Sequence, residues 1–180
     1  MHRITKKVLT ILFAAGIYCV LERFIGISTY LDVVRITYAQ PFIVWVSVLT
    51  GPLIGGITGG IGELLSQVGD PGWDWPTIVC TILNCTAIGF FTREIDVNSG
   101  FFDKNEIIYF NKIQLFSNFI VWEILYSALN FWLNGEKLRV VLARGFWIAM
   151  NNSISCMMIT SLFLALYTKT RMTAANFYRE

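Results

Sequence analysis

The fold is decided by the stretch GPLIGGITGGIGELLSQVGDPGWDW, residues 51–75. Gly51, Gly55 and Gly59 recur at four-residue spacing, and a second glycine row follows one position later. Inside a helix in water, each glycine costs roughly 1 kcal/mol relative to alanine. In a bilayer, glycines at this spacing let helix backbones approach closely. The pattern therefore predicts a membrane helix with a glycine face for contact with other helices.

The same stretch becomes polar toward its end. Glu63 and Gln67 interrupt the apolar pattern, and a loop with Trp73 and Trp75 follows. Ionisable side chains within a membrane helix usually face a cavity or a partner charge. We therefore expect this end of the helix to face something other than lipid.

The composition excludes an ordinary soluble domain. The 180 residues are 55% hydrophobic and only 14% charged, with a mean hydropathy of +0.58. Soluble domains are about 25% charged. We therefore expect an all-α integral membrane protein of the cell membrane. The length allows a single membrane-embedded domain over residues 1–180, without an appended soluble enzyme.

Apolar segments separated by polar loops predict a bundle of six transmembrane helices. The segments are 8–25, 39–50, 52–67, 76–92, 107–133 and 142–168, and a polar tail is expected over 169–180. The segment 39–50 is shorter than the roughly 20 residues that cross a bilayer. It either extends through 36–38 or forms half of a re-entrant hairpin with 52–67. The topology after residue 68 is the same in both cases.

The basic residues set the orientation, because they favour the cytoplasmic side. In the six-pass arrangement, the inner side carries Arg3, Lys6, Lys7, Arg93, Lys104, Lys112, Lys169, Arg171 and Arg179. The outer side carries only Arg35, Lys137 and Arg139, with Arg23 and Arg144 at outer helix ends. Both termini are therefore expected in the cytoplasm.

The polar residues within the predicted helices gather toward the outer side. The candidate substrate-binding residues are Glu63, Gln67, Trp73, Asn84, Trp122, Glu123, Tyr126, Arg144, Trp147, Asn151 and Asn152. Asn84 is expected near the midplane and the others above it. Polar residues that only join helices have no reason to prefer one leaflet, so the set predicts a pocket that opens outward.

Each of these residues also has a structural interpretation. Arg144 can form a bridge with Glu63 or with Glu123, and the asparagines can join helices by hydrogen bonds. Trp73 and Trp75 lie where an interfacial aromatic belt would place them. If Arg144 does not neutralise both acids, Glu63 and Glu123 favour a cationic ligand.

The sequence contains no catalytic or metal-binding pattern. Its single His is residue 2, and its four cysteines lie in apolar runs without a C-x-x-C pair. It also lacks the G-x-x-x-x-G-K-[ST] phosphate loop. We therefore predict no enzymatic activity, no metal, no cofactor and no nucleic-acid partner.

Taken together, several segments resemble a known family. They are TYAQPFIVWVSVLTGPLIGGITGGIGELL at 37–65, the pair Trp73 and Trp75, GFFTREIDVNSGFFDKNEIIYFNKIQ at 89–114, and LYTKTR at 166–171. In this order and spacing, the chain resembles the substrate-binding S components of energy-coupling-factor (ECF) vitamin transporters, in the riboflavin-type group.

The resemblance implies a six-helix protein that captures a vitamin outside the cell. It also implies docking on a transmembrane coupling subunit that carries two ABC ATPases. Riboflavin is the default ligand of the group. The face for the coupling subunit would be formed by small residues, here Thr10, Ala14, Ala15, Gly51, Gly55 and Gly59.

The chain departs from the family pattern within the expected pocket. Glu63 stands where relatives usually have His, Gln67 where they have Asp, and LDVVRI at 31–36 replaces an Asn/Thr-rich loop. These differences leave other ligands open, among them cobalamin, hydroxymethylpyrimidine and thiamine-like compounds. A stand-alone secondary carrier and a membrane scaffold without a ligand are the alternatives from other classes.

Overall fold

The computed structural model describes residues 2–28, 35–95, 97 and 102–177. In chain order its elements are α1 (His2–Phe24), β1 (Gly26–Ser28), β2 (Arg35–Thr37), α2 (Ala39–Thr50), α3 (Pro52–Ser66), α4 (Trp75–Phe91), α5 (Lys104–Asn118), η2 (Phe119–Tyr126), α6 (Ser127–Leu133), α7 (Leu138–Ser155), η3 (Cys156–Thr160) and α8 (Ser161–Phe177). The segments η2 and η3 are π-helical and lie within continuous helices. The described residues thus form six helical passes.

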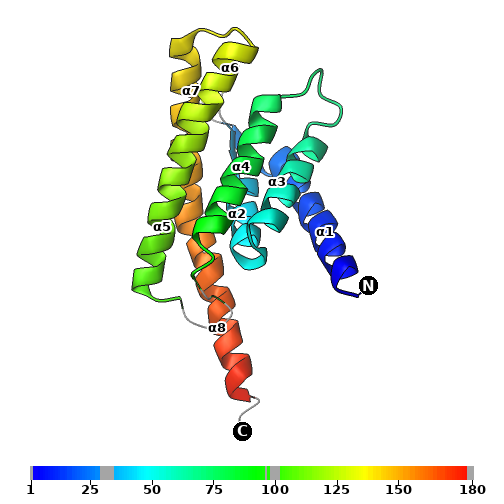
Figure 1. Ribbon diagram of the computed structural model, residues 1–180, viewed down its shortest axis with the longest axis vertical. Coiled ribbons are helices and arrows are strands. Elements are labelled where there is room, and N and C mark those ends of the chain that lie inside the picture. The colour runs from blue at the N-terminus through cyan, green and yellow to red at the C-terminus, as the bar shows by residue number, and fades with distance from the viewer. Residues whose placement is uncertain (1, 29–34, 96, 98–101, 178–180) are drawn as a thin grey trace.

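The passes form one bundle (Figure 1). The two long passes, α5–η2–α6 and α7–η3–α8, run beside each other, and η2 packs against α7. On the other side, α3 packs between α1 and α4. The ends of the chain lie at one end of the bundle, and the α3–α4 and α6–α7 connections lie at the other (Figure 1).

Local sequence signals explain where the helices begin and end. Gly51 adopts a φ of +89° after α2, a conformation that favours glycine, and Pro52 then begins α3 with a φ suited to a first helical turn. The Asp74 side chain accepts a hydrogen bond from the Thr77 backbone N–H at the start of α4. Asp103 forms a capping box at the start of α5. These three connections therefore carry local signals that begin α3, α4 and α5.

The predicted helical fold is confirmed, with two differences. The predicted segment 39–50 coincides with α2. In place of a plain loop, β1 pairs with β2 as antiparallel strands, with Gly26 opposite Thr37. The expected polar tail from residue 169 is helical over its described part, because α8 continues without a break to Phe177. Part of the predicted loop 26–38 lies outside the described residues.

Two helices in the described part of the chain are long and apolar enough to cross a membrane, Ile4–Phe24 and Leu138–Arg171. Two shorter apolar helices, Ala39–Thr50 and Trp75–Phe91, accompany them. An apolar cluster that includes Val44, Ile88, Phe110 and Leu164 joins α2, α4, α5 and α8.

Candidate functional site

Two cavities of about 380 and 200 Å³ lie between the ends of α1, α3 and α4 that are farthest from the chain termini. Both are lined by Glu22, Glu63, Asp74 and Thr77, so we treat them as one polar chamber. The larger cavity adds Arg23, Ser66, Gln67 and Asp70 to the walls. The smaller adds Tyr18, Gln40, Trp122, Tyr126, Asn151 and Asn152. Residues from all six helical passes thus meet here.

Glu63 is the central acid of the polar chamber. Only 5% of its surface is exposed. Its Oε2 accepts a hydrogen bond from the Tyr18 hydroxyl at 2.6 Å, and its Oε1 accepts one from Gln67 Nε2 at 3.1 Å. Both donors are neutral, and neither salt bridge found among the described residues includes Glu63. The carboxylate is therefore held in position without a positive partner.

The orientation of Gln67 is fixed by a backbone group. Its Oε1 accepts a hydrogen bond from the Asp74 backbone N–H at 2.8 Å. A backbone N–H can only donate, so the amide oxygen must face it and the NH₂ group is directed to Glu63. The α3–α4 connection thus sets the direction of the hydrogen bond that Glu63 receives.

Arg23 and Thr37 join α1 to the rim of the polar chamber. The Arg23 guanidinium donates to the carbonyl oxygens of Ser66 and Val68, and lies 3.7 Å from the Asp70 carboxylate. The Thr37 hydroxyl donates to Glu22 Oε2 at 2.7 Å. Arg23 is thus engaged by carbonyl groups and by an acid at the rim.

One wall of the polar chamber is aromatic. The rings of Trp122 and Tyr126 lie 5.8 Å apart between centroids, and both residues belong to the π-helical segment η2. Such segments are rare in proteins overall, but those that occur often lie at functional sites. Trp122 Nε1 and Gln40 Nε2 are buried, and neither has a hydrogen-bond partner in the described part of the chain. This wall therefore offers ring faces and two unused donors.

The structure brings together about half of the residues that the sequence predicted for the pocket. Six of them line the polar chamber: Glu63, Gln67, Trp122, Tyr126, Asn151 and Asn152. Five do not: Trp73, Asn84, Glu123, Arg144 and Trp147. Their positions have separate explanations.

Arg144 pairs with neither Glu63 nor Glu123. It forms a two-pronged bridge to Glu136, with N–O distances of 2.9 and 2.8 Å. Glu136 lies only eight residues earlier, in the α6–α7 connection, so a local partner takes the place of the distant ones. Trp147 is 52% exposed on the outside of α7, where it packs against Phe146. Depth along a helix was predictable, whereas rotation about its axis was not.

Asn84 belongs to a buried hydrogen-bond network. Its Nδ2 donates to Asn118 Oδ1 at 3.1 Å, and its Oδ1 accepts from the Ser117 hydroxyl at 2.7 Å. Asn118 donates in turn to Gln114, which donates to the Ser153 carbonyl. We call Asn84, Asn118 and Gln114 the amide chain. It joins α4, α5 and α7. Asn84 therefore links helices, which agrees with the structural interpretation of the asparagines.

Glu123 and Trp73 also lie outside the polar chamber. Glu123 Oε2 is buried without a hydrogen-bond partner among the described residues. Trp73 lies in the α3–α4 connection with its ring 6.2 Å from that of Trp75, and about half of each side chain is exposed. This exposure fits the aromatic belt.

The small residues proposed for a partner are mostly used within the chain. Ala14 and Ala15 are buried. A Cβ on Gly55 would collide with Ser47 of α2, and one on Gly59 would lie 3.1 Å from the Cys85 sulfur of α4. Gly51 forms the α2–α3 turn, and only Thr10 is exposed. Gly55 and Gly59 therefore contact other helices of this chain, and their use in binding a coupling subunit stays a prediction.

Sequence reasoning missed several residues of the polar chamber: Tyr18, Glu22, Arg23, Gln40, Asp74 and Thr77. Tyr18 and Gln40 lie in apolar segments with no sign of which side faces inward. Asp74 did carry a signal, because an Asp shortly before Pro76 is typical of a helix N-cap. That cap places its carboxylate in the wall.

Comparisons with known proteins agree with this architecture. A family model described as "ECF-type riboflavin transporter, S component" matches residues 3–169. A UPF0397 protein of Enterococcus faecalis is 28% identical over 178 residues, which cover 97% of this chain and 96% of that protein. UPF0397 proteins of Lacticaseibacillus casei and Staphylococcus aureus are 29% and 27% identical, over 97% of this chain and 95% and 96% of theirs. Because the family match spans nearly the whole chain, the protein belongs to the ECF-type riboflavin transporter S-component family, whose members are membrane-embedded transporter components.

Proposed function

We propose that this protein captures a water-soluble vitamin outside the cell and delivers it through a transmembrane coupling subunit powered by two separate ABC ATPases. The observation that carries the proposal is the polar chamber at one end of an apolar helical bundle. Pockets that bind small molecules are typically about 300 to 1,000 Å³ with a few well-placed polar groups. The family consists of transporter components, and we infer that the chain itself catalyses no reaction.

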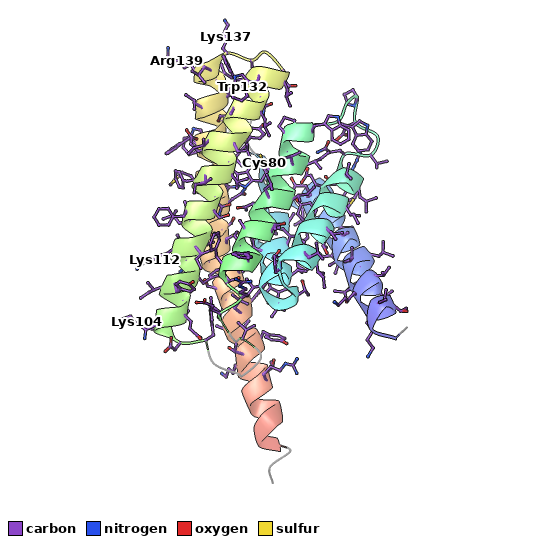
Figure 2. The ribbon with its side chains drawn as sticks, in the orientation of Figure 1. Cys80, Lys104, Lys112, Trp132, Lys137 and Arg139 are labelled. Atoms are coloured by element: carbon purple, nitrogen blue, oxygen red, sulfur yellow. The ribbon has the colours of Figure 1, made fainter. Side chains whose placement is uncertain are left out.

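We further propose that the whole chain is one domain with six membrane passes and with both termini in the cytoplasm. The distribution of basic residues supports this orientation. Figure 2 shows Lys104 and Lys112 toward the end of the bundle that holds the termini, and Lys137 and Arg139 at the opposite end. The polar chamber then lies toward the outside, where a solute arrives.

Riboflavin is the first ligand to test, because the family description names it. The rings of Trp122 and Tyr126 suit a planar ligand, since aromatic side chains stack on flat rings. Gln40, Asn151 and Asn152 offer amide groups to its polar edges. Cobalamin, hydroxymethylpyrimidine and thiamine-like compounds are the further candidates.

Transport in proteoliposomes tests this proposal. We expect uptake of the vitamin only when the chain is reconstituted with a coupling subunit and ATPases, and only with ATP inside. Uptake by the chain alone on an ion gradient would instead establish a secondary carrier.

A pair of tryptophan variants tests the site. Trp122→Ala removes a buried ring of the polar chamber, whereas Trp132→Ala removes a ring that is 76% exposed near the α6–α7 connection (Figure 2). We expect at least a tenfold loss of vitamin affinity in the first variant and no change in the second. Equal affinities would place the binding site elsewhere.

A further inference from the structure

We propose that the polar chamber selects a flat organic cation, with its positive group against Glu63. This inference rests on the proposed function and names the chemical class of its solute. It separates this chain from a binder of neutral flavins.

The first argument is the charge of Glu63. The side chain is 5% exposed, and its two hydrogen-bond donors, Tyr18 and Gln67, are neutral. A buried carboxylate without a positive partner is unfavourable unless a cation compensates it or the acid takes up a proton. Arg144, the cation that the sequence suggested as a partner of Glu63, is engaged by Glu136. A positively charged ligand would supply the missing partner.

The second argument is independent of charge. Gln40 and Trp122 line the smaller cavity, and each is only 4% exposed. Gln40 Nε2 and Trp122 Nε1 have no hydrogen-bond partner among the described residues. Buried donors in proteins are nearly always paired. The two free donors therefore indicate a ligand that also carries an acceptor group.

The third argument separates an organic cation from a metal ion. No group of three or more His, Cys, Asp or Glu side chains in the described part of the chain could hold a metal. Glu63 and Asp74 instead lie in the walls of a cavity that also includes the rings of Trp122 and Tyr126. Aromatic faces attract cations and stack on flat rings. A nitrogen-containing aromatic ring with a positive charge fits both.

Substitution of Glu63 tests the charge directly. Glu63→Gln keeps the shape of the side chain and resembles a protonated acid, whereas Glu63→Asp keeps the charge. Glu94→Gln is the matched control, because Glu94 is exposed between α4 and α5, outside the chamber. Gel filtration and thermal unfolding in detergent establish that each variant is folded.

The experiment is to purify each variant in mild detergent from cells that also contain the coupling subunit and ATPases, and to identify the released small molecules by mass spectrometry. We expect wild type, Glu94→Gln and Glu63→Asp to release an aromatic compound that is cationic at pH 7. We expect at least tenfold less of it from Glu63→Gln. Equal release from Glu63→Gln, or release of a neutral or anionic compound by wild type, would overturn the inference.

The outcomes also separate this inference from the transport proposal. If wild type copurifies with the coupling subunit but releases only neutral compounds, or none, transport stands and the cation inference fails. If it neither associates with a coupling subunit nor releases a small molecule, both fail. Thiamine and riboflavin, added to the purified wild type, provide a direct comparison of a cationic and a neutral ring compound. Tighter binding of riboflavin would count against the inference.

Discussion

The amide chain and the polar chamber are both buried and both polar, but their hydrogen bonds differ. In the amide chain, Asn84, Asn118 and Gln114 each donate to a protein acceptor. In the polar chamber, the amide of Gln40 and the indole of Trp122 donate to nothing in the described part of the chain. The second set lines a cavity.

This difference separates structural polar residues from candidate binding residues. Polar groups that pair with one another leave nothing for a ligand to satisfy. Unpaired donors beside a cavity keep their hydrogen bonds available, and a ligand can complete them. The same residue types, asparagine and glutamine, therefore serve two purposes in one bundle, and only the partners reveal which.

The strongest test of this comparison is Gln114→Leu. The change leaves Asn118 Nδ2 without its acceptor and removes the side-chain donor to the Ser153 carbonyl, which keeps the Cys156 backbone N–H. Unsatisfied buried groups cost about 1 to 3 kcal/mol each, and hydrogen bonds within membranes are often at the low end. We expect a loss of about 2 kcal/mol in unfolding by SDS in mixed micelles.

Ligand affinity, measured on the folded fraction of Gln114→Leu, should equal that of wild type. A large loss of affinity with unchanged stability would mean that the amide chain belongs to the binding site.

Gly62→Ala tests the support behind the polar chamber. An added Cβ would lie 2.7 to 2.9 Å from ring and Cβ atoms of Tyr18, so Tyr18 must move away from Glu63. Overpacking of this kind costs about 1 to 3 kcal/mol. We expect a loss of about 1 to 2 kcal/mol in the same assay and at least a fivefold loss of ligand affinity.

Gly16→Ala is the matched control, because Gly16 lies in α1 with nothing within 4 Å of the added Cβ. It should keep both stability and affinity. If Gly62→Ala behaves in the same way, the contact between Tyr18 and α3 is not needed for the site.

Some features of the fold and of the candidate site could be predicted from the sequence, and others could not. The six segments and the end of the bundle where polar residues gather follow from hydropathy and from breaks such as Gly51-Pro52. These signals are local, and each helix carries its own. Glu63 and Gln67 were therefore assigned to the end of the bundle where the polar chamber lies.

Helix rotation and packing partners could not be predicted in this way. A helix with polar residues on two sides, such as α7, does not reveal which side faces inward. Asn151 and Asn152 line the polar chamber, while Arg144 and Trp147 do not. The glycines of α3 predicted close helix contact correctly, but not that the contact is within the chain. The use of the candidate residues in binding stays a prediction.

Arg144→Gln tests whether Arg144 lies outside the ligand-binding part of the polar chamber. The variant removes the bridge between Arg144 and Glu136. The side chains of these two residues are 23% and 28% exposed, respectively. Bridges with solvent access contribute about 0 to 1 kcal/mol. We expect a loss of at most about 1 kcal/mol in unfolding by SDS and no change in ligand affinity. A loss of affinity as large as that of Glu63→Gln would return Arg144 to the site.

The smallest effect on stability is expected for Gln40→Leu, the same substitution as Gln114→Leu but within the polar chamber. Within the described residues, Gln40 Nε2 has no partner to lose, and removing an unpaired buried donor also removes its desolvation cost. Stability without ligand should therefore stay the same or rise by about 1 kcal/mol, while ligand affinity falls at least fivefold. Unfolding by SDS and ligand titration on the same preparations measure both quantities. A loss of stability equal to that of Gln114→Leu would mean that Gln40 is also a structural amide, and the difference between the two regions would disappear.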